Sequence, residues 1–312
     1  MATTRPPARH DHTPASITPR TTPPIGRRVL ANLPTAELVE DSIRAGEGLI
    51  AAEGPLVVRT GHHTGRSPKD KFIVDEPTST GKIWWGEVNR PISEEHYDRL
   101  RSRLVAYCAE KDLYSQDLLI GADPHHRRRL RVYTETAWAS IFARNLFRRP
   151  RKSDLHGFEP NFTIINVPSF HADTETEGTR SETAILLHLQ RMEIIIVGTE
   201  YAGEIKKSAF TVMNYLMPDE GVLPMHSSVN VGSEGDSAVF FGLSGRARPR
   251  SPPTPSGASS ATTSTAGAIA ACSTSRAAAT RRRSAYPRCT SRTSSRPHGA
   301  SGRSSRTSTS IR

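Results

Sequence analysis

Two adjacent lysines stand out among the residues whose chemistry could serve a reaction. Lys206 and Lys207, in YAGEIKK (residues 201–207), fall in the first turn of an expected helix. Cations there oppose the helix dipole, at a cost of about 0.3–1 kcal/mol each. Because a helix start favours anions, the pair indicates that an anion or a metal ion binds nearby. A pair of ordinary surface lysines is the alternative, and this segment alone does not separate the two.

A second basic group lies in RTGHHTGRSPKDKF (residues 59–72). Its glycines bracket a turn that presents Arg66, with Lys69 and Lys71 close behind. A guanidinium on a glycine-rich turn suits bidentate binding of a carboxylate or a phosphate. Taken alone, however, the segment favours a solvated basic loop. His226, in PMHSSVNVG, lies near the end of an expected strand and could hold a metal ion, although a lone histidine is more often structural.

The sequence after the expected strand AVFF (residues 238–241) matches only the first part of a nucleotide-binding motif. The residues that follow match the start of the phosphate-loop pattern G-x-x-x-x-G-K-[ST]; they are Gly242, Leu243, Ser244 and Gly245. Ala247, Arg248 and Pro249 then stand where the second glycine, the lysine and the hydroxyl belong. The fragment is a weak signal alone and gains weight beside the other three segments.

The charge of the chain is uneven. The 312 residues carry a formal net charge of +11, which suggests a nucleic acid or an anionic membrane as partner. Residues 246–312 hold 13 arginines and no lysine or acidic residue, so residues 1–245 hold 29 basic and 31 acidic residues. The tail also has no Leu, Val, Phe, Met or Trp, and it cannot offset a backbone entropy of roughly 1–2 kcal/mol per residue. We expect the tail, and a Pro/Thr/Arg-rich leader over residues 1–29, to be disordered.

Helical and strand patterns mix between residues 30 and 245, which predicts an α/β body. Helices are expected at 35–52 (core positions Leu38, Ile43 and Leu49), 92–111 (N-cap Ser93), from a cap at Thr134 or Thr136 to Phe147, and 204–218. Strands are expected at 55–61, 71–77, around the basic turn PHHRRR, at 161–170, in a hairpin over 182–203, and in the two segments that carry His226 and Gly242.

One cysteine of three, Cys108, lies in this body, which fits a reducing cytoplasm. Apolar runs such as Ile194 to Val197 are too short to span a membrane.

Six segments, in order, resemble the ATP-dependent phosphoenolpyruvate carboxykinase family. They are HTGRSPKDKF, NVPSFHAD, GTRSETAILL, GTEYAGEIKKSAFTVMNYLMP, MHSSVNVG and VFFGLSG. The resemblance runs from about residue 30 to Gly245 and is specific because no single short motif carries it. It implies a mixed α+β N-terminal substrate-binding domain over residues 30–200, followed by the beginning of a P-loop nucleotide and metal domain over residues 201–245.

The resemblance also implies the chemistry. The family converts oxaloacetate and ATP to phosphoenolpyruvate, carbon dioxide and ADP in gluconeogenesis, with Mn²⁺ at one site and Mg²⁺ on the nucleotide. Arg66 matches an arginine that holds the substrate carboxylate, and Tyr201 matches a substrate-side tyrosine. Lys206 matches a lysine near the transferred phosphoryl group, and Lys207 and His226 match two Mn²⁺ ligands that also border the nucleotide. Residues 242–245 match the start of the phosphate loop.

The family pattern continues G-L-S-G-T-G-K-T-T-L-S, and this chain departs from it after Gly245. Back-translation of T-G-K-T-T-L-S with one base deleted gives R-A-R-P-R-S-P, which are residues 246–252. The hypothesis is therefore a single-base frameshift after Gly245, with residues 246–312 as its product. Without the loop lysine and hydroxyl, and without the acidic metal ligand and second arginine of the family, we expect no carboxykinase activity from the chain as written.

Two other functions compete with this interpretation. A nucleic-acid-binding protein would use the 13 tail arginines on phosphates, but the tail has one aromatic residue, Tyr286, and no binding module. A different P-loop kinase would not explain GEIKK or MHSSVNVG. We therefore expect small-molecule substrates, no membrane, no specific nucleic acid and a monomer.

Overall fold

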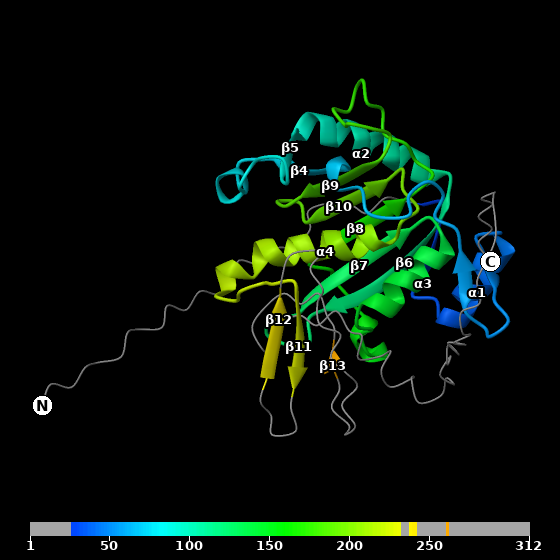
Figure 1. The fold of residues 1–312 in the computed structure, drawn as a ribbon. Helices are drawn as coiled ribbons and strands as arrows, with labels where there is room; N and C mark the ends of the chain where they lie inside the picture. The colour runs from blue at the N-terminus through cyan, green and yellow to red at the C-terminus, as the bar shows by residue number, and fades with distance from the viewer. Residues whose placement is uncertain (1–25, 232–236, 242–259, 262–312) are drawn as a thin grey trace, which may run out of the picture.

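The computed structural model describes residues 26–231, 237–241 and 260–261. Its centre is an eight-stranded mixed sheet, shown in Figure 1. Across the sheet the strands are β1 (Arg28–Ala31), β6 (Asp112–Ile120), β7 (Arg128–Thr134), β8 (Phe162–Val167), β10 (Glu193–Val197), β9 (Ala184–His188), β4 (Lys71–Asp75) and β5 (Arg90–Ser93). The β6–β7 and β10–β9 pairs are antiparallel, and the other neighbours are parallel.

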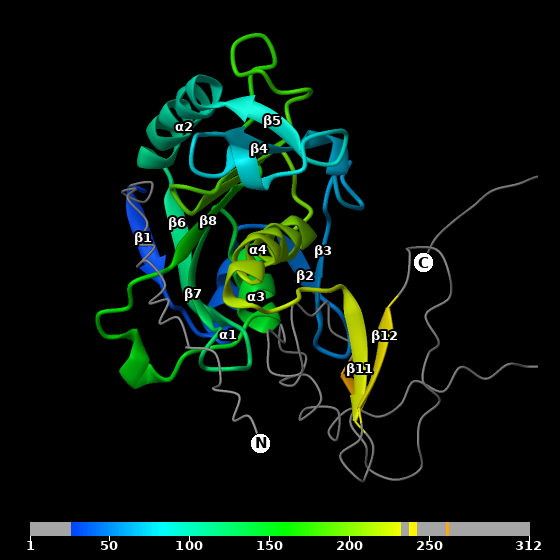
Figure 2. The same ribbon diagram turned by 90° about the vertical axis from the view of Figure 1, so that its left-hand side faces the viewer.

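Helices cover both faces of the sheet (Figure 2). Helix α2 (Glu94–Ala109) packs on one face, and α3 (Ala137–Leu146) and α4 (Gly203–Leu216) pack on the other. Alternation along β10 divides the core accordingly: Ile194 and Ile196 pack with α4, whereas Ile195 and Val197 pack with α2. All five β10 residues are buried, as expected for a strand covered on both faces.

The remaining elements lie around this core. They are α1 (Thr35–Arg44), the hairpin β2 (Gly48–Ile50) and β3 (Leu56–Val58), the short 3₁₀ helices η1 (Pro68–Asp70), η2 (Thr80–Lys82), η3 (Lys152–Leu155) and η4 (Pro218–Glu220), and a small sheet of β12 (Ser237–Phe241), β11 (Ser227–Val231) and β13 (Ser260–Ala261). In Figure 1 the β11–β12 hairpin lies beyond the edge of α4, away from the large sheet.

The first helix is shorter than the range 35–52 expected from the sequence. Helix α1 ends at Arg44, and Gly46 follows with a left-handed φ of 72°, so the chain turns and continues as β2. Leu38 is buried as predicted, but Ile43 and Leu49 are 42% and 74% exposed. Glycine beyond a helix end is a common stop signal, and it outweighed the apolar spacing.

Two helix starts show how side chains cap backbone N–H groups. Ser93 Oγ accepts from the N–H of His96, which confirms the predicted cap of α2. Thr136 occupies the N-cap position of α3, but its side chain makes no capping bond. The carboxylate of Glu47 instead accepts from the N–H groups of Ala137 and Trp138, at 3.0 and 2.9 Å. A distant acidic residue thus replaces the expected threonine.

Two expected domain boundaries, after residue 29 and at residue 201, lie close to elements of the structure. Strand β1 begins at Arg28, inside the leader expected over residues 1–29, of which residues 1–25 lie outside the described part. Helix α4 shares its core with the large sheet, although it begins just after the boundary expected at residue 201. Among the described residues, no helix has the length and apolar character needed to cross a membrane.

Candidate functional site

The candidate site begins where β10 leaves the sheet. Gly198 follows β10 with a left-handed φ of 67°, and its carbonyl accepts from Thr183 Oγ1 at 2.7 Å. Thr183 Oγ1 also lies 3.1 Å from His63 Nε2, on the loop that precedes β4. The chain then enters α4, where a Cβ at Gly203 would overlap the ring of Tyr201. Gly203 therefore leaves room for the half-buried Tyr201 at the start of the helix.

Lys207 and His226 come together although 19 positions separate them. Lys207 Nζ lies 3.5 Å from His226 Nε2. The ring of Phe210, one helical turn beyond Lys207, lies 5.5 Å from that Nζ and 6.0 Å from the His226 ring. Both side chains are half-buried. Two nitrogen atoms that could bind a metal ion therefore lie close together beside the ring of Phe210.

The glycine-rich basic loop lies against the start of α4. The N–H of Ser67 donates to Glu204 Oε1 at 2.8 Å, and Glu204 is buried in the first turn of α4. Buried Asp70 accepts from Arg180 at 2.7 Å and from Ser181 Oγ at 2.9 Å. These contacts hold the part of the loop that follows Arg66, whose own side chain is exposed.

Lys71 connects the same loop to the middle of α4. Its Nζ donates to Thr211 Oγ1, and burial lowers the pKa of Lys71 to about 8. The nearby Glu204 carboxylate opposes this shift, whereas the positive charges of Arg66 and Lys207 add to it. The positive charges of Arg66 and Lys207 are therefore close enough to Lys71 to act on its amine.

Of the predicted site residues, the structure brings Arg66, Tyr201, Lys206, Lys207 and His226 to the same end of α4. Lys206 is half-buried in the first turns of that helix. The phosphate-loop residues 242–245 lie outside the described residues, although β12, which leads to them, pairs with the β11 strand that follows His226.

Lys207 and His226 could supply two of the ligands of a divalent metal ion. Two nitrogen ligands at about 2.1 Å from one ion lie about 3.0–3.5 Å apart, which matches the Lys207–His226 spacing. No group of three or more His, Cys, Asp or Glu residues in the described ranges could hold a metal ion. The described residues thus supply two converging nitrogens, and further ligands would come from elsewhere.

Three contributors were missed by the sequence analysis: Glu204, Phe210 and Thr211. The sequence could have indicated Glu204, because an acidic residue in the first turn of a helix offsets the unfavourable interaction of Lys206 and Lys207 with the helix dipole. Phe210 and Thr211 had no such signal, since a residue at helical spacing from Lys207 is as easily a core residue or a surface residue. Their contacts depend on the tertiary packing of the loop and His226.

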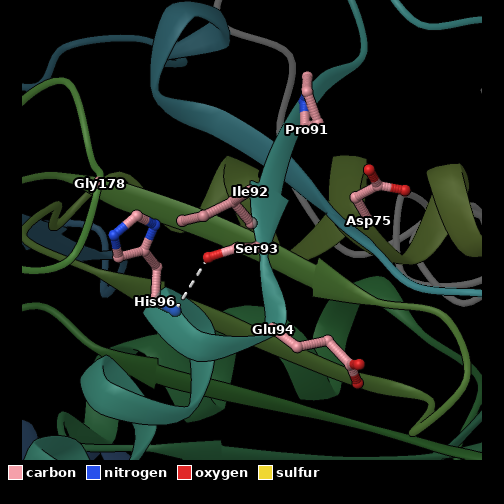
Figure 3. Close-up of a pocket in the computed structure, with 7 residues that line it drawn as sticks. All are labelled: Asp75, Pro91, Ile92, Ser93, Glu94, His96 and Gly178. Carbon is pink, nitrogen blue, oxygen red and sulfur yellow. Dashed lines mark hydrogen bonds between the residues drawn. The ribbon is translucent and has the colours of Figure 1, made fainter.

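A separate cavity of about 580 Å³ lies at the end of β5 and the start of α2. Its lining consists of Asp75, Pro91, Ile92, Ser93, Glu94, His96 and Gly178 (Figure 3). None of the predicted site residues belongs to it.

The lowered pKa of Lys71 predicts a pH dependence of stability. Between its folded pKa of about 8 and its ordinary value of 10.5, the unfolded chain binds more protons at this position than the folded chain. The free energy of unfolding should therefore rise by about 1–2 kcal/mol from pH 7.5 to 9.5, relative to Lys71→Met. Urea titrations of both proteins at the two pH values measure this difference. Equal pH dependence of the two proteins would contradict the assignment.

Comparison with known proteins agrees with the geometry. A family model described as phosphoenolpyruvate carboxykinase, of the ATP-dependent type, matches residues 27–248. The chain is 55% identical over 223 residues to phosphoenolpyruvate carboxykinase (ATP) of Thermus thermophilus, covering 70% of this chain and 42% of that protein. It is 53% identical over 217 residues to phosphoenolpyruvate carboxykinase (ATP) 1 of Moorella thermoacetica, covering 70% and 41%. The chain spans about two fifths of the length of these relatives. The chain belongs to the ATP-dependent phosphoenolpyruvate carboxykinase family.

Proposed function

We propose that this chain carries the substrate and metal side of a phosphoenolpyruvate carboxykinase, which converts oxaloacetate and ATP to phosphoenolpyruvate, carbon dioxide and ADP. The observation that carries the proposal is the 3.5 Å approach of Lys207 Nζ to His226 Nε2, beside the loop that holds Arg66. Substrates, metal ions and the reaction come from the family, of which this chain covers a part.

Each residue has a proposed role that suits its chemistry. Arg66 binds the substrate carboxylate, for which its planar guanidinium is suited, and Tyr201 contacts the substrate from the start of α4. Lys207 and His226 hold Mn²⁺ and border the nucleotide, and Lys206 lies near the transferred phosphoryl group. Mn²⁺, when bound, would stabilise negative charge that develops as carbon dioxide leaves.

The nucleotide side of the proposal depends on residues outside the described part. Residues 242–245 would begin the loop that holds the phosphates of Mg²⁺-bound ATP. Ala247, Arg248 and Pro249 supply neither the lysine nor the hydroxyl of that loop, and Pro249 has no N–H to donate. We propose that a single-base frameshift after Gly245 produced this departure and that the chain as written does not turn over oxaloacetate.

The proposal also covers the domains of the chain, its oligomeric state and its cellular compartment. A substrate-binding domain over residues 30–200 and a nucleotide and metal domain that starts at 201 are proposed from the family resemblance. Of the tail expected to be disordered, Ser260–Ala261 form β13, and the other residues lie outside the described part. A monomer in the cytoplasm is proposed as well, and the buried free thiol of Cys108 supports a reducing compartment.

Binding of Mn²⁺ tests the metal site without requiring turnover. Titration with MnCl₂, followed by the electron paramagnetic resonance signal of free Mn²⁺, should show one site in the unmodified chain. His226→Gln should weaken it at least about tenfold, because it removes a ligand nitrogen, whereas His96→Gln in the separate cavity should not. Equal binding by His226→Gln and the unmodified chain would refute the site.

The frameshift is tested at the level of the gene. Resequencing across the codon for Gly245 should reveal the missing base or a reading-frame junction. Repairing the frame should restore oxaloacetate-dependent consumption of ATP. Turnover by the purified 312-residue chain would refute the proposed inactivity.

A further inference from the structure

The hydroxyl of Thr211 joins the basic loop to the helix that carries the metal-ligand pair. We propose that Lys71 and Thr211 are positioning residues that fix the backbone of Lys207 for metal binding. This inference rests on the proposed function, because it assigns a purpose to a contact beside the proposed Mn²⁺ site. The hydrogen bonds from Lys71 to Thr211 and from Thr211 to Lys207 are called here the Lys71–Thr211 bridge.

The direction of each bond follows from the groups involved. A protonated lysine has donors and no acceptor, so Lys71 Nζ must donate to Thr211 Oγ1. A hydroxyl has one proton, and that of Thr211 goes to the carbonyl oxygen of Lys207 at 3.0 Å. The charge of Lys71 therefore strengthens the bond that Thr211 makes to the Lys207 backbone.

Lys71 is a rigid starting point for the bridge. It is the first residue of β4 and pairs with Ile185 of β9 inside the large sheet. The bridge therefore connects a sheet strand with the backbone of a helix that could otherwise shift over the sheet. Its anchor lies on an element that does not depend on the bound metal.

A second contact from the same segment makes the arrangement specific to Lys207. Glu204 accepts from the N–H of Ser67 one turn before Lys207, and Thr211 accepts from Lys71 one turn after it. Residues three and four positions apart lie on one face of a helix, so Glu204, Lys207 and Thr211 share a face. Lys207 thus lies between two attachments of α4 to residues 67–71.

A purely structural role of Thr211 within its own helix would explain its bond to Lys207 but not its bond to Lys71. Threonine hydroxyls inside helices often bond the carbonyl four residues back. That hydrogen bond does not require a lysine beside Thr211. Burial and the charges of Arg66 and Lys207 disfavour the protonated form of Lys71, and the Glu204 carboxylate offsets this only in part. An unfavourable cation kept beside the proposed metal ligands indicates a purpose other than stability.

The test compares Thr211→Val, which removes the hydroxyl at nearly the same size, with Thr211→Ser, which keeps it. MnCl₂ titration should show about tenfold weaker binding for Thr211→Val, as is typical when a group that orients a metal ligand is lost, and unchanged binding for Thr211→Ser. Val212→Ala is the matched control. It removes core contacts of the next residue on α4, so it should lower the melting temperature and leave Mn²⁺ affinity unchanged.

A double-mutant cycle tests whether Lys71 acts through Thr211. Lys71→Met should weaken Mn²⁺ binding by a similar factor, and Lys71→Met combined with Thr211→Val should be no weaker than the single variants. Additive losses would show that Lys71 acts independently of Thr211 and would overturn the bridge. Unchanged affinity in Thr211→Val would overturn it as well.

A metal-free measurement keeps the inference testable if the unmodified chain binds no Mn²⁺, a result that would count against the proposed function alone. Trace acetylation with isotope-coded acetic anhydride, followed by mass spectrometry, reports how accessible the Lys207 amine is. Thr211→Val should raise the labelling rate of Lys207 several-fold, with Thr211→Ser and Val212→Ala at the unmodified rate. An unchanged rate in Thr211→Val would refute the positioning role.

Discussion

Gly198→Ala is expected to destabilise the protein by more than about 3 kcal/mol. Gly198 has a left-handed φ of 67°, which costs an alanine about 1–2 kcal/mol. A Cβ at this position would also overlap the carbonyl of Glu182 and lie 2.9 Å from Thr183 Cα. Because these neighbours are backbone atoms, no side-chain rotation relieves the overlap. Equilibrium unfolding in urea measures the loss.

A second glycine separates the two components of this effect. Gly221 has a φ of 72°, but a Cβ there would meet no atom within 4 Å. Gly221→Ala should therefore cost only the backbone component, about 1–2 kcal/mol. If Gly198→Ala costs no more than Gly221→Ala, the close approach of the Glu182 carbonyl is not a constraint in solution.

The consequence of Gly198→Ala for the site follows from the same contacts. The Gly198 carbonyl accepts from Thr183 Oγ1, which also contacts His63 on the basic loop. Displacement of the carbonyl would shift both the loop and the entry to α4. Folded Gly198→Ala should therefore bind Mn²⁺ more weakly, whereas Gly221→Ala should bind it normally.

Sequence patterns predicted the elements that the core holds in place. Strand patterns predicted the β9–β10 hairpin, and Ser93 predicted the start of α2, whose buried residues include Tyr97, Leu100, Leu104 and Cys108. The same reasoning failed after Arg44, where Gly46 turns the chain and Leu49 is exposed. Periodicity identifies a face that can be buried, but tertiary packing decides which face is covered.

The candidate site was predictable to a smaller extent. The family resemblance indicated Lys207 and His226, and the structure places their nitrogens 3.5 Å apart. No local pattern could connect Ser67 with Glu204, which are 137 positions apart, or Lys71 with Thr211, which are 140 apart. Such contacts arise because β4 is a strand of the sheet on which α4 packs, and that proximity is a property of the fold.

Glu193→Gln is the second substitution with a large expected effect, about 3 kcal/mol of unfolding free energy. Glu193 is 1% exposed and begins β10. Its carboxylate accepts from Arg101 at 2.6 and 3.2 Å and from the hydroxyl of Tyr97. Burial and this neighbouring carboxylate raise the pKa of Tyr97, so its hydroxyl stays a donor. Neutralising the carboxylate removes the opposite charge that compensates a largely buried guanidinium.

An exposed pair on the same helix provides the comparison that isolates burial. Arg99 and Glu95 form an ion pair at 3.1 Å, with side chains 47% and 79% exposed. Glu95→Gln should change the free energy of unfolding by no more than about 1 kcal/mol, because water screens the ion pair and also the interaction of Glu95 with the dipole of α2. The two substitutions make the same chemical change on ion pairs of the same helix, so a difference between them in urea unfolding measures the effect of burial. Equal losses would show that Glu193 is not the buried attachment between α2 and β10, the strand that leads to Gly198 and the candidate site.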